Sequence, residues 1–115
     1  KEPTTAMNTT TDTDTADTVT YALSKVVTDG TGYAAQELGR PAAAKTGTTD
    51  DNKSAWFVGY TPQLATAVLM AKEDSDGMPV SLSGTGGLST VTGGSYPAAI
   101  WAAFSALKTS LYASI

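Results

Sequence analysis

Three short runs with the composition of β-strands, joined by very short turns, constrain the fold of this chain more than any other feature. The runs cover about residues 43–49, 54–60 and 64–71, and small, β-branched and aromatic residues dominate them. The connections between them are the turn-forming sequences DDNK and TPQ. Strands joined by such short connections lie side by side and run antiparallel. The sequence therefore predicts a three-stranded antiparallel meander.

Amphipathic patterns predict a helix on each side of this meander. The first begins at about Thr15 and stops at Gly30. Its apolar stripe consists of Ala16, Val19, Leu23, Val26 and Val27. The second covers residues 97–112 and opens with Pro97. Its apolar stripe, which we expect to be core, consists of Ile100, Phe104, Leu107 and Leu111, with Trp101 alongside.

These elements predict the α+β class, an antiparallel sheet flanked by helices with the 97–112 helix packed on one face. Such a meander leaves one sheet edge and the other face uncovered, and such surfaces invite a partner. The run DGTGYAAQELGRP is expected to be a loop with one short helical turn. Residues 72–94 are rich in glycine and are expected to be loop-like, without the Lys-Ser/Thr pair of a phosphate-binding P-loop.

The amino-terminal segment differs in composition from the rest. Residues 1–15 are rich in Thr and Asp and are interpreted as a flexible, solvated connector, whereas residues 16–115 form the folded unit. Asp12, Asp14 and Asp17 resemble part of a calcium loop, but the glycine and the closing glutamate of an EF-hand are missing. No metal site is predicted. The chain opens with Lys1 and is interpreted as a fragment or a processed piece.

Composition excludes several kinds of function. The 115 residues contain no Cys and no His, which removes disulfides, thiolate metal sites and a Ser-His-Asp hydrolase. Any acid–base chemistry must use Lys, Asp, Glu or Tyr. Lys and Arg total 7 and are scattered in a chain of net charge -4, so we expect no nucleic-acid partner. No cofactor is predicted.

The sequence Lys45-Thr46-Gly47-Thr48 on the first predicted strand contains the residues best suited to bind a ligand. A lysine there places a cation beside an accessible strand edge, to which an extended peptide can add by strand pairing. Gly47 has no side chain, so a ligand backbone can approach closely. Thr46 and Thr48 point to the same face, and their hydroxyls together with the Lys45 ammonium can hold a carboxylate.

The surrounding sequence resembles a known family. Lys45-Thr46-Gly47 matches the third signature of the serine penicillin-recognising enzymes. The run GRPAAAKTGTTDDNKSAWFVGYTPQLATAV, together with GGSYPAAIW, resembles the carboxy-terminal part of the transpeptidase domain of class A (bifunctional) penicillin-binding proteins. The resemblance covers residues 16–104. It implies a penicillin-binding-protein/β-lactamase-like fold and a peptidoglycan D,D-transpeptidase, the target of β-lactams.

The resemblance also implies site roles. Lys45 would lie near the nucleophilic serine and set the local electric field. Thr46 and Thr48 would bind the terminal carboxylate of a D-Ala-D-Ala stem peptide or of a β-lactam, with Gly47 and Thr49 in the same substrate-binding strand. The backbone N–H of Thr48 would form half of the oxyanion hole, which makes Lys45 and Thr48 the catalytic candidates.

Three positions depart from the family pattern and leave fine specificity open. Ala44 stands where the family usually has Gly, and Ser54 where Asp is common. The pair Leu69-Met70 replaces a frequent Trp-Val. Trp56 and Phe57 are expected on opposite faces of the sheet in packing roles, and neither is given a site role.

The nucleophile of the family is missing. Ser105-Ala106-Leu107-Lys108 matches SxxK literally, but the family's tetrad lies far upstream of KTG and begins a helix. Neither Asn8 nor Asn52 completes an SxN triad. We therefore expect the chain to be inactive without an upstream segment of the same domain that carries both motifs. The resemblance further implies the extracytoplasmic face of the bacterial membrane, with anchoring by an amino-terminal span absent from this chain.

Two other interpretations remain open at this point. One is a D,D-carboxypeptidase or β-lactamase that shares the KTG strand. The other is a non-catalytic cell-wall binding module. The runs AWFVGYTP and GGSYPAAIW favour the bifunctional enzyme.

Overall fold

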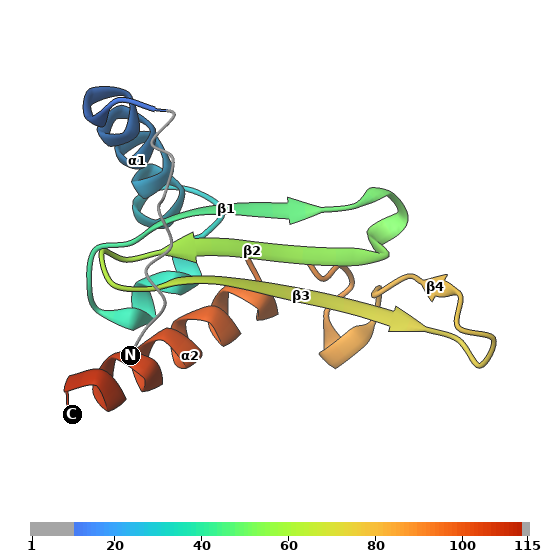
Figure 1. The fold of residues 1–115 in the computed structure, drawn as a ribbon. Helices are drawn as coiled ribbons and strands as arrows, with labels where there is room; N and C mark the ends of the chain where they lie inside the picture. The colour runs from blue at the N-terminus through green and yellow to red at the C-terminus, as the bar shows by residue number, and fades with distance from the viewer. Residues whose placement is uncertain (1–10, 114–115) are drawn as a thin grey trace.

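Four antiparallel strands form one sheet in the order β1-β2-β3-β4 (Figure 1). The computed structural model describes residues 11–113. Strands β1 (Ala43–Thr48), β2 (Ser54–Tyr60) and β3 (Ala65–Glu73) form the meander, which confirms the three predicted strands and their antiparallel order. The short β4 (Pro79–Val80) was not predicted and pairs only with the end of β3. The architecture is the expected α+β arrangement.

The turn between β1 and β2 is a short 3-10 segment, η2 (Asp50–Asn52). Asp51 and Asn52 have φ angles of 58° and 53°, a left-handed conformation that Asp and Asn tolerate better than most residues. The Asn52 amide donates to the Val91 carbonyl at 2.6 Å and accepts from the Val91 N–H at 3.0 Å. The turn is therefore fixed to a loop nearly 40 residues away in the sequence.

Helix α2 (Tyr96–Ala113) packs across one face of the sheet, as predicted (Figure 1). Phe57 of β2 and Trp101 of α2 are both fully buried, and their rings lie 5.3 Å apart between centroids. The core cluster at this contact consists of Val27, Ala35, Ala44, Phe57, Ala98, Trp101 and Ala102. A smaller cluster of Ala55, Leu82 and Val91 lies under the loops that follow β3.

The predicted core stripe of this helix is wrong. Ile100, Phe104, Leu107 and Leu111 are 41–60% exposed, whereas Ala98, Trp101, Ala102 and Ser105 are buried. Alanine and large apolar residues surround the helix on nearly all sides, so the sequence permits more than one apolar stripe. The small residues face the sheet because they allow close packing, and Trp101 fixes the rotation of the helix.

Helix α1 (Thr13–Thr28) begins at an Asp12 N-cap, slightly before the predicted start at about Thr15. The Thr15 N–H donates to the Asp12 carboxylate at 2.7 Å. Only the last turns pack: Val27 is buried, while Ala16 and Val19 of the predicted stripe are exposed. Figure 1 shows the amino-terminal end of α1 projecting away from the sheet. Residues 1–10 of the predicted flexible segment lie outside the described residues.

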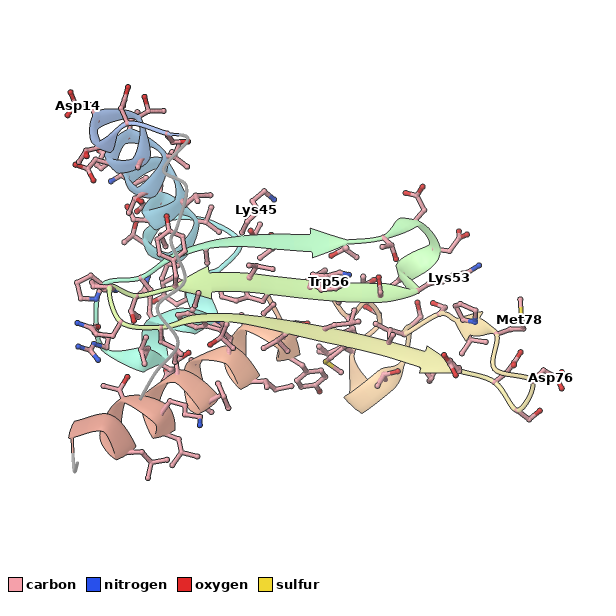
Figure 2. The ribbon with its side chains drawn as sticks, in the orientation of Figure 1. Asp14, Lys45, Lys53, Trp56, Asp76 and Met78 are labelled. Atoms are coloured by element: carbon pink, nitrogen blue, oxygen red, sulfur yellow. The ribbon has the colours of Figure 1, made fainter. Side chains whose placement is uncertain are left out.

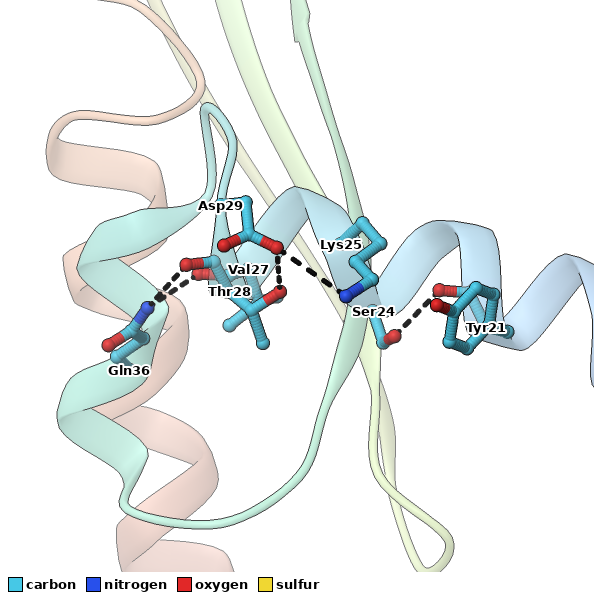
Figure 3. A network of polar contacts seen from close by, with 7 residues as sticks. All are labelled: Tyr21, Ser24, Lys25, Val27, Thr28, Asp29 and Gln36. Carbon is cyan, nitrogen blue, oxygen red and sulfur yellow. Dashed lines mark hydrogen bonds and ion pairs between the residues drawn. The ribbon is translucent and has the colours of Figure 1, made fainter.

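The predicted short helical turn is η1 (Tyr33–Leu38), and it closes the end of α1. The Gln36 side-chain amide donates to the carbonyl oxygens of Val27 at 2.9 Å and Thr28 at 3.2 Å (Figure 3). Those carbonyls belong to the last turn of α1 and have no partner within the helix. The segment η1 is thereby fixed against the carboxy-terminal end of α1. The glycine-rich loop after β4 contains a further short turn, η3 (Thr85–Gly87).

The two faces of the sheet differ sharply in burial. Residues 57 and 59 of β2 lie on the covered face, while Trp56 and Val58 lie on the opposite one, which confirms that Trp56 and Phe57 point to opposite sides. We call this second surface the outer face. It contains Lys45, Trp56, Val58, Ala67 and Leu69, all of which are exposed. The predicted uncovered face is confirmed for these five residues. At the Ala43–Tyr60 pair, α1 reaches the same face, and the Thr20 hydroxyl lies 2.8 Å from the Tyr60 hydroxyl.

Candidate active site

The register of β1 against β2 places the KTG residues on two faces. Lys45 pairs with Val58 and Gly47 with Trp56, so these residues belong to the outer face. Thr46 pairs with Phe57 and therefore lies on the α2 face, as does Thr48. Figure 2 shows Lys45 standing off β1 on the side away from α2. The prediction that Thr46 and Thr48 share a face is confirmed, and Lys45 lies on the other one.

The Lys45 side chain nevertheless returns to the strand edge. Its ammonium donates a hydrogen bond of 2.7 Å to the carbonyl oxygen of Thr46. The ammonium is exposed and has no carboxylate partner among the described residues. A cation without a counter-ion, held at an open edge, is suited to an anionic ligand.

The backbone of β1 directs the polar groups of alternate residues toward this edge. The N–H of Thr49 points to β2, where it donates to the Ser54 carbonyl at 3.0 Å. Because hydrogen-bonding direction alternates along an antiparallel strand, the N–H and C=O groups of Thr46 and Thr48 point away from β2. The contact of the Lys45 ammonium with the Thr46 carbonyl agrees with this direction. β1 is the outermost strand of the described sheet, so no neighbouring strand pairs with these groups.

Both threonine hydroxyls are contacted by residues outside the strand. The Thr46 hydroxyl lies 2.8 Å from the Thr31 hydroxyl in the loop after α1. The Thr48 hydroxyl accepts a hydrogen bond of 3.3 Å from the N–H of Gly93, just before α2. Sequence reasoning missed Thr31 and Gly93, because they lie 15 and 45 residues away from their partners. Gly93 begins the GGSYPAAIW run, whose only signal in the sequence was its resemblance to the family.

Gly47 and Thr49 complete the predicted strand. A Cβ atom on Gly47 would meet the Trp56 Cβ at 3.5 Å, an ordinary contact, so the fold itself does not require glycine there. The Thr49 hydroxyl accepts from the Ser54 N–H at 2.9 Å and lies 3.2 Å from the Ser54 hydroxyl. That hydroxyl already holds the turn into β2, so Thr49 is the least available of the predicted ligand-binding groups.

The serine of the literal SxxK match lies in the core. Ser105 is 2% exposed, in the middle of α2, and its hydroxyl has no hydrogen-bond partner among the described residues. The Lys108 ammonium lies over the Phe104 ring, 5.8 Å from its centroid. A buried hydroxyl within a packed helix cannot reach a substrate carbonyl. This placement agrees with the interpretation that the match is fortuitous.

The acidic residues near the amino terminus form no loop. Asp12 caps α1, and Asp14 lies in its first turn. In residues 11–113, no group of three or more acidic, His or Cys residues is arranged to hold a metal ion. None of the helices within that range is long and apolar enough to cross a membrane.

Comparison with known proteins agrees with the sequence resemblance. The family model described as the penicillin binding protein transpeptidase domain matches residues 1–89. The GGSYPAAIW run lies beyond the matched residues, so its resemblance remains a prediction.

Relatives among curated proteins bear the name penicillin-binding protein 1A. That of Rickettsia typhi is 48% identical over 46 residues, which cover 40% of this chain and 6% of the relative. That of Neisseria lactamica is 51% identical over 53 residues, which cover 42% of this chain and 7% of the relative. That of Aquifex aeolicus is 41% identical over 63 residues, which cover 55% of this chain and 9% of the relative. The aligned parts thus span less than a tenth of each relative. With most of its length matched by the family model, this chain belongs to the penicillin-binding-protein transpeptidase domain family.

Proposed function

We propose that this chain supplies the substrate-binding strand of a peptidoglycan D,D-transpeptidase whose nucleophile lies on an upstream segment of the same domain. One observation carries the proposal. Lys45 shares the uncovered outer face with an apolar row, Trp56, Val58 and Leu69. A cation at the border of an exposed apolar surface suits a partner that both packs on the sheet and delivers a reacting group.

The substrate binds along the free edge of β1. The stem peptide, ending in D-Ala-D-Ala, adds as an extra strand to the backbone groups of Thr46 and Thr48 that point away from β2. Its terminal carboxylate lies against the two hydroxyls and the Lys45 ammonium, where charge-assisted hydrogen bonds hold it. Gly47 permits close approach, and Thr49 continues the strand. A β-lactam carboxylate occupies the same position.

The reaction is acyl transfer through a serine ester. The companion serine attacks the carbonyl of the penultimate D-Ala, the terminal D-Ala leaves with a proton, and an acyl-serine ester forms. The amine of a second stem peptide then attacks the ester, which forms the cross-link and releases the serine. The N–H of Thr48 stabilises the negative carbonyl oxygen, and Lys45 provides a positive field beside the serine. No cofactor takes part.

The match to the penicillin binding protein transpeptidase domain model favours a transpeptidase over a carboxypeptidase, a β-lactamase or a non-catalytic module. A peptidoglycan substrate also sets the location. We place the whole protein, a class A (bifunctional) enzyme, at the extracytoplasmic face of the bacterial membrane, anchored by an amino-terminal span outside this chain.

Labelled penicillin tests the proposal in the assembled domain. We expect mass spectrometry to find the adduct on a serine of the upstream segment and none on this chain, whether it is incubated alone or assembled. Excess unlabelled penicillin should abolish the label, which controls for non-specific reaction. A label on Ser105, or no label on the assembled domain, contradicts the proposal.

A further inference from the structure

Two groups from outside the KTG strand contact its threonine hydroxyls. The Gly93 N–H donates to the Thr48 hydroxyl, and the Thr31 hydroxyl lies within hydrogen-bond distance of the Thr46 hydroxyl. The two groups come from different parts of the chain, the segment before α2 and the loop after α1. Neither belongs to the KTG motif.

Gly93 is held tightly in place. Its carbonyl accepts from the Ala98 N–H at 3.1 Å, which ties it to the first turn of α2. A Cβ atom on Gly93 would overlap the Trp56 carbonyl and lie 3.0 Å from the Gly47 nitrogen. Real Cβ atoms do not approach backbone so closely, so only glycine places its N–H at this distance from Thr48.

Thr31 is also fixed by its neighbours. The following residue, Gly32, donates from its N–H to the Val26 carbonyl of α1 at 2.8 Å. A Cβ atom on Gly94 would overlap the Thr31 carbonyl, so glycine at residue 94 allows the two backbone segments to approach closely. The Thr31 hydroxyl is thus held against Thr46 although the residue is exposed.

The number of protons decides what these contacts do. A threonine hydroxyl has one proton to donate and can accept two hydrogen bonds. The Gly93 N–H can only donate, so the Thr48 hydroxyl accepts from it and keeps its proton free. For the Thr46–Thr31 pair either hydroxyl can be the donor, and among the described residues Thr46 has no other side-chain partner. Only a proton donated by Thr31 leaves the Thr46 proton free.

We propose that Thr31 and Gly93 are positioning residues that donate to Thr46 and Thr48 and so aim both hydroxyl protons at the ligand carboxylate. The inference rests on the proposed function of this strand. A hydroxyl that accepts one hydrogen bond is polarised and donates the next more strongly. The arrangement therefore favours an anion over a neutral group at the same place.

The test compares two ligands on the assembled domain. Benzylpenicillin carries the carboxylate, and its methyl ester does not. We expect Thr31→Val to slow acylation by benzylpenicillin roughly three- to tenfold, the effect of losing one hydrogen bond, and to leave the ester rate unchanged. Thr31→Ser should retain the wild-type rate. Thr28→Val is a matched control, because the Thr28 hydroxyl contacts Asp29 instead of the strand.

Other outcomes overturn the inference. Equal slowing with both ligands, together with a lower melting temperature, assigns Thr31 a structural role only. If Thr46→Val slows acylation by benzylpenicillin but Thr31→Val leaves that rate unchanged, Thr31 does not position the Thr46 hydroxyl. In the Thr46→Val background, Thr31→Val should have no further effect, and an additive effect contradicts the coupling.

The proposed function fails in a distinguishable way. If the wild-type domain does not react with benzylpenicillin, or if Thr46→Val leaves its rate unchanged, the carboxylate site itself is wrong. If that site holds and only the Thr31 variants behave like wild type, the proposed function stands and the positioning role does not.

Discussion

The indole of Trp101 lies so close beneath Gly59 that a Cβ atom on residue 59 would approach two indole carbons to 2.9 Å. The indole N–H donates to the carbonyl oxygens of Gly59 at 3.3 Å and Thr66 at 3.1 Å. These contacts join α2 to β2 and β3 at once. They fix the rotation of the helix and the sheet from which the KTG strand extends.

Stability should depend on this contact. We expect Gly59→Ala to lower the free energy of unfolding of the assembled domain by about 1–3 kcal/mol, since the added methyl group overpacks the core. Denaturant unfolding measures the loss. Trp101→Phe should also destabilise but relieve part of the overlap, so the double variant should lose less than the sum of the two. Fully additive losses would show that Gly59 and Trp101 are not coupled.

The Thr46 hydroxyl should contribute to acylation. Thr46→Val removes a hydrogen bond to a carboxylate, worth about 1–3 kcal/mol, which corresponds to roughly 5- to 150-fold slower acylation by penicillin. Stopped-flow measurement of the acylation rate constant checks this. Thr109→Val is the control, because the Thr109 hydroxyl donates to the Ser105 carbonyl within α2, away from the strand edge. Equal rates for wild type and Thr46→Val would remove the carboxylate role.

Two glycine-to-alanine changes should separate binding from stability. Gly47→Ala meets only an ordinary contact, so the melting temperature should hold while acylation slows, because the methyl group obstructs ligand approach. Gly93→Ala overlaps the Trp56 carbonyl and should lower the melting temperature. Thermal unfolding and acylation rates are measured on both variants. A lower melting temperature for Gly47→Ala, or a wild-type melting temperature for Gly93→Ala, would contradict these roles of the two glycines.

The outer face should bind the upstream segment. Leu69 is 49% exposed there, and Leu69→Lys should weaken association by about 2 kcal/mol, because a buried leucine contributes about that much. Met78→Lys is the matched control: Met78 is also apolar and exposed, but it lies on the loop after β3, far from Lys45 (Figure 2). Titration of the two segments, followed by sedimentation, measures both affinities. Equal weakening by the two changes would argue against a specific interface.

The start of α1 should respond to acid. The backbone hydrogen bond from Thr15 lowers the pKa of Asp12 from its ordinary value of 3.8. Because the pKa of Asp12 is lowered, its charged carboxylate stabilises the helix at pH values above the ordinary pKa. This contribution is lost as the pH falls through the lowered pKa. The Thr15 amide resonance should report the loss in an NMR titration. Asp12→Asn keeps the cap without the charge and should remove this transition; a transition that persists would have another cause.

The sequence determined the meander because local information suffices for it. Alternation within residues 54–60 and the turn chemistry of DDNK and TPQ define strands, turns and antiparallel order without distant contacts. The same alternation placed Thr46 and Thr48 on one face and separated Trp56 from Phe57. KTG and its flanking sequence also identified the family correctly, since those motifs are local.

Only the tertiary structure decided which helix face is buried and what holds the site. Several faces of α2 are apolar. The face with Trp101 packs on the sheet because Gly59 leaves room for the indole. The contacts of Thr31 and Gly93 with the KTG strand join distant segments, and no local pattern encodes such pairs. Their physical basis is close backbone approach, which becomes apparent only when the sheet, the loop after α1 and the start of α2 are packed together.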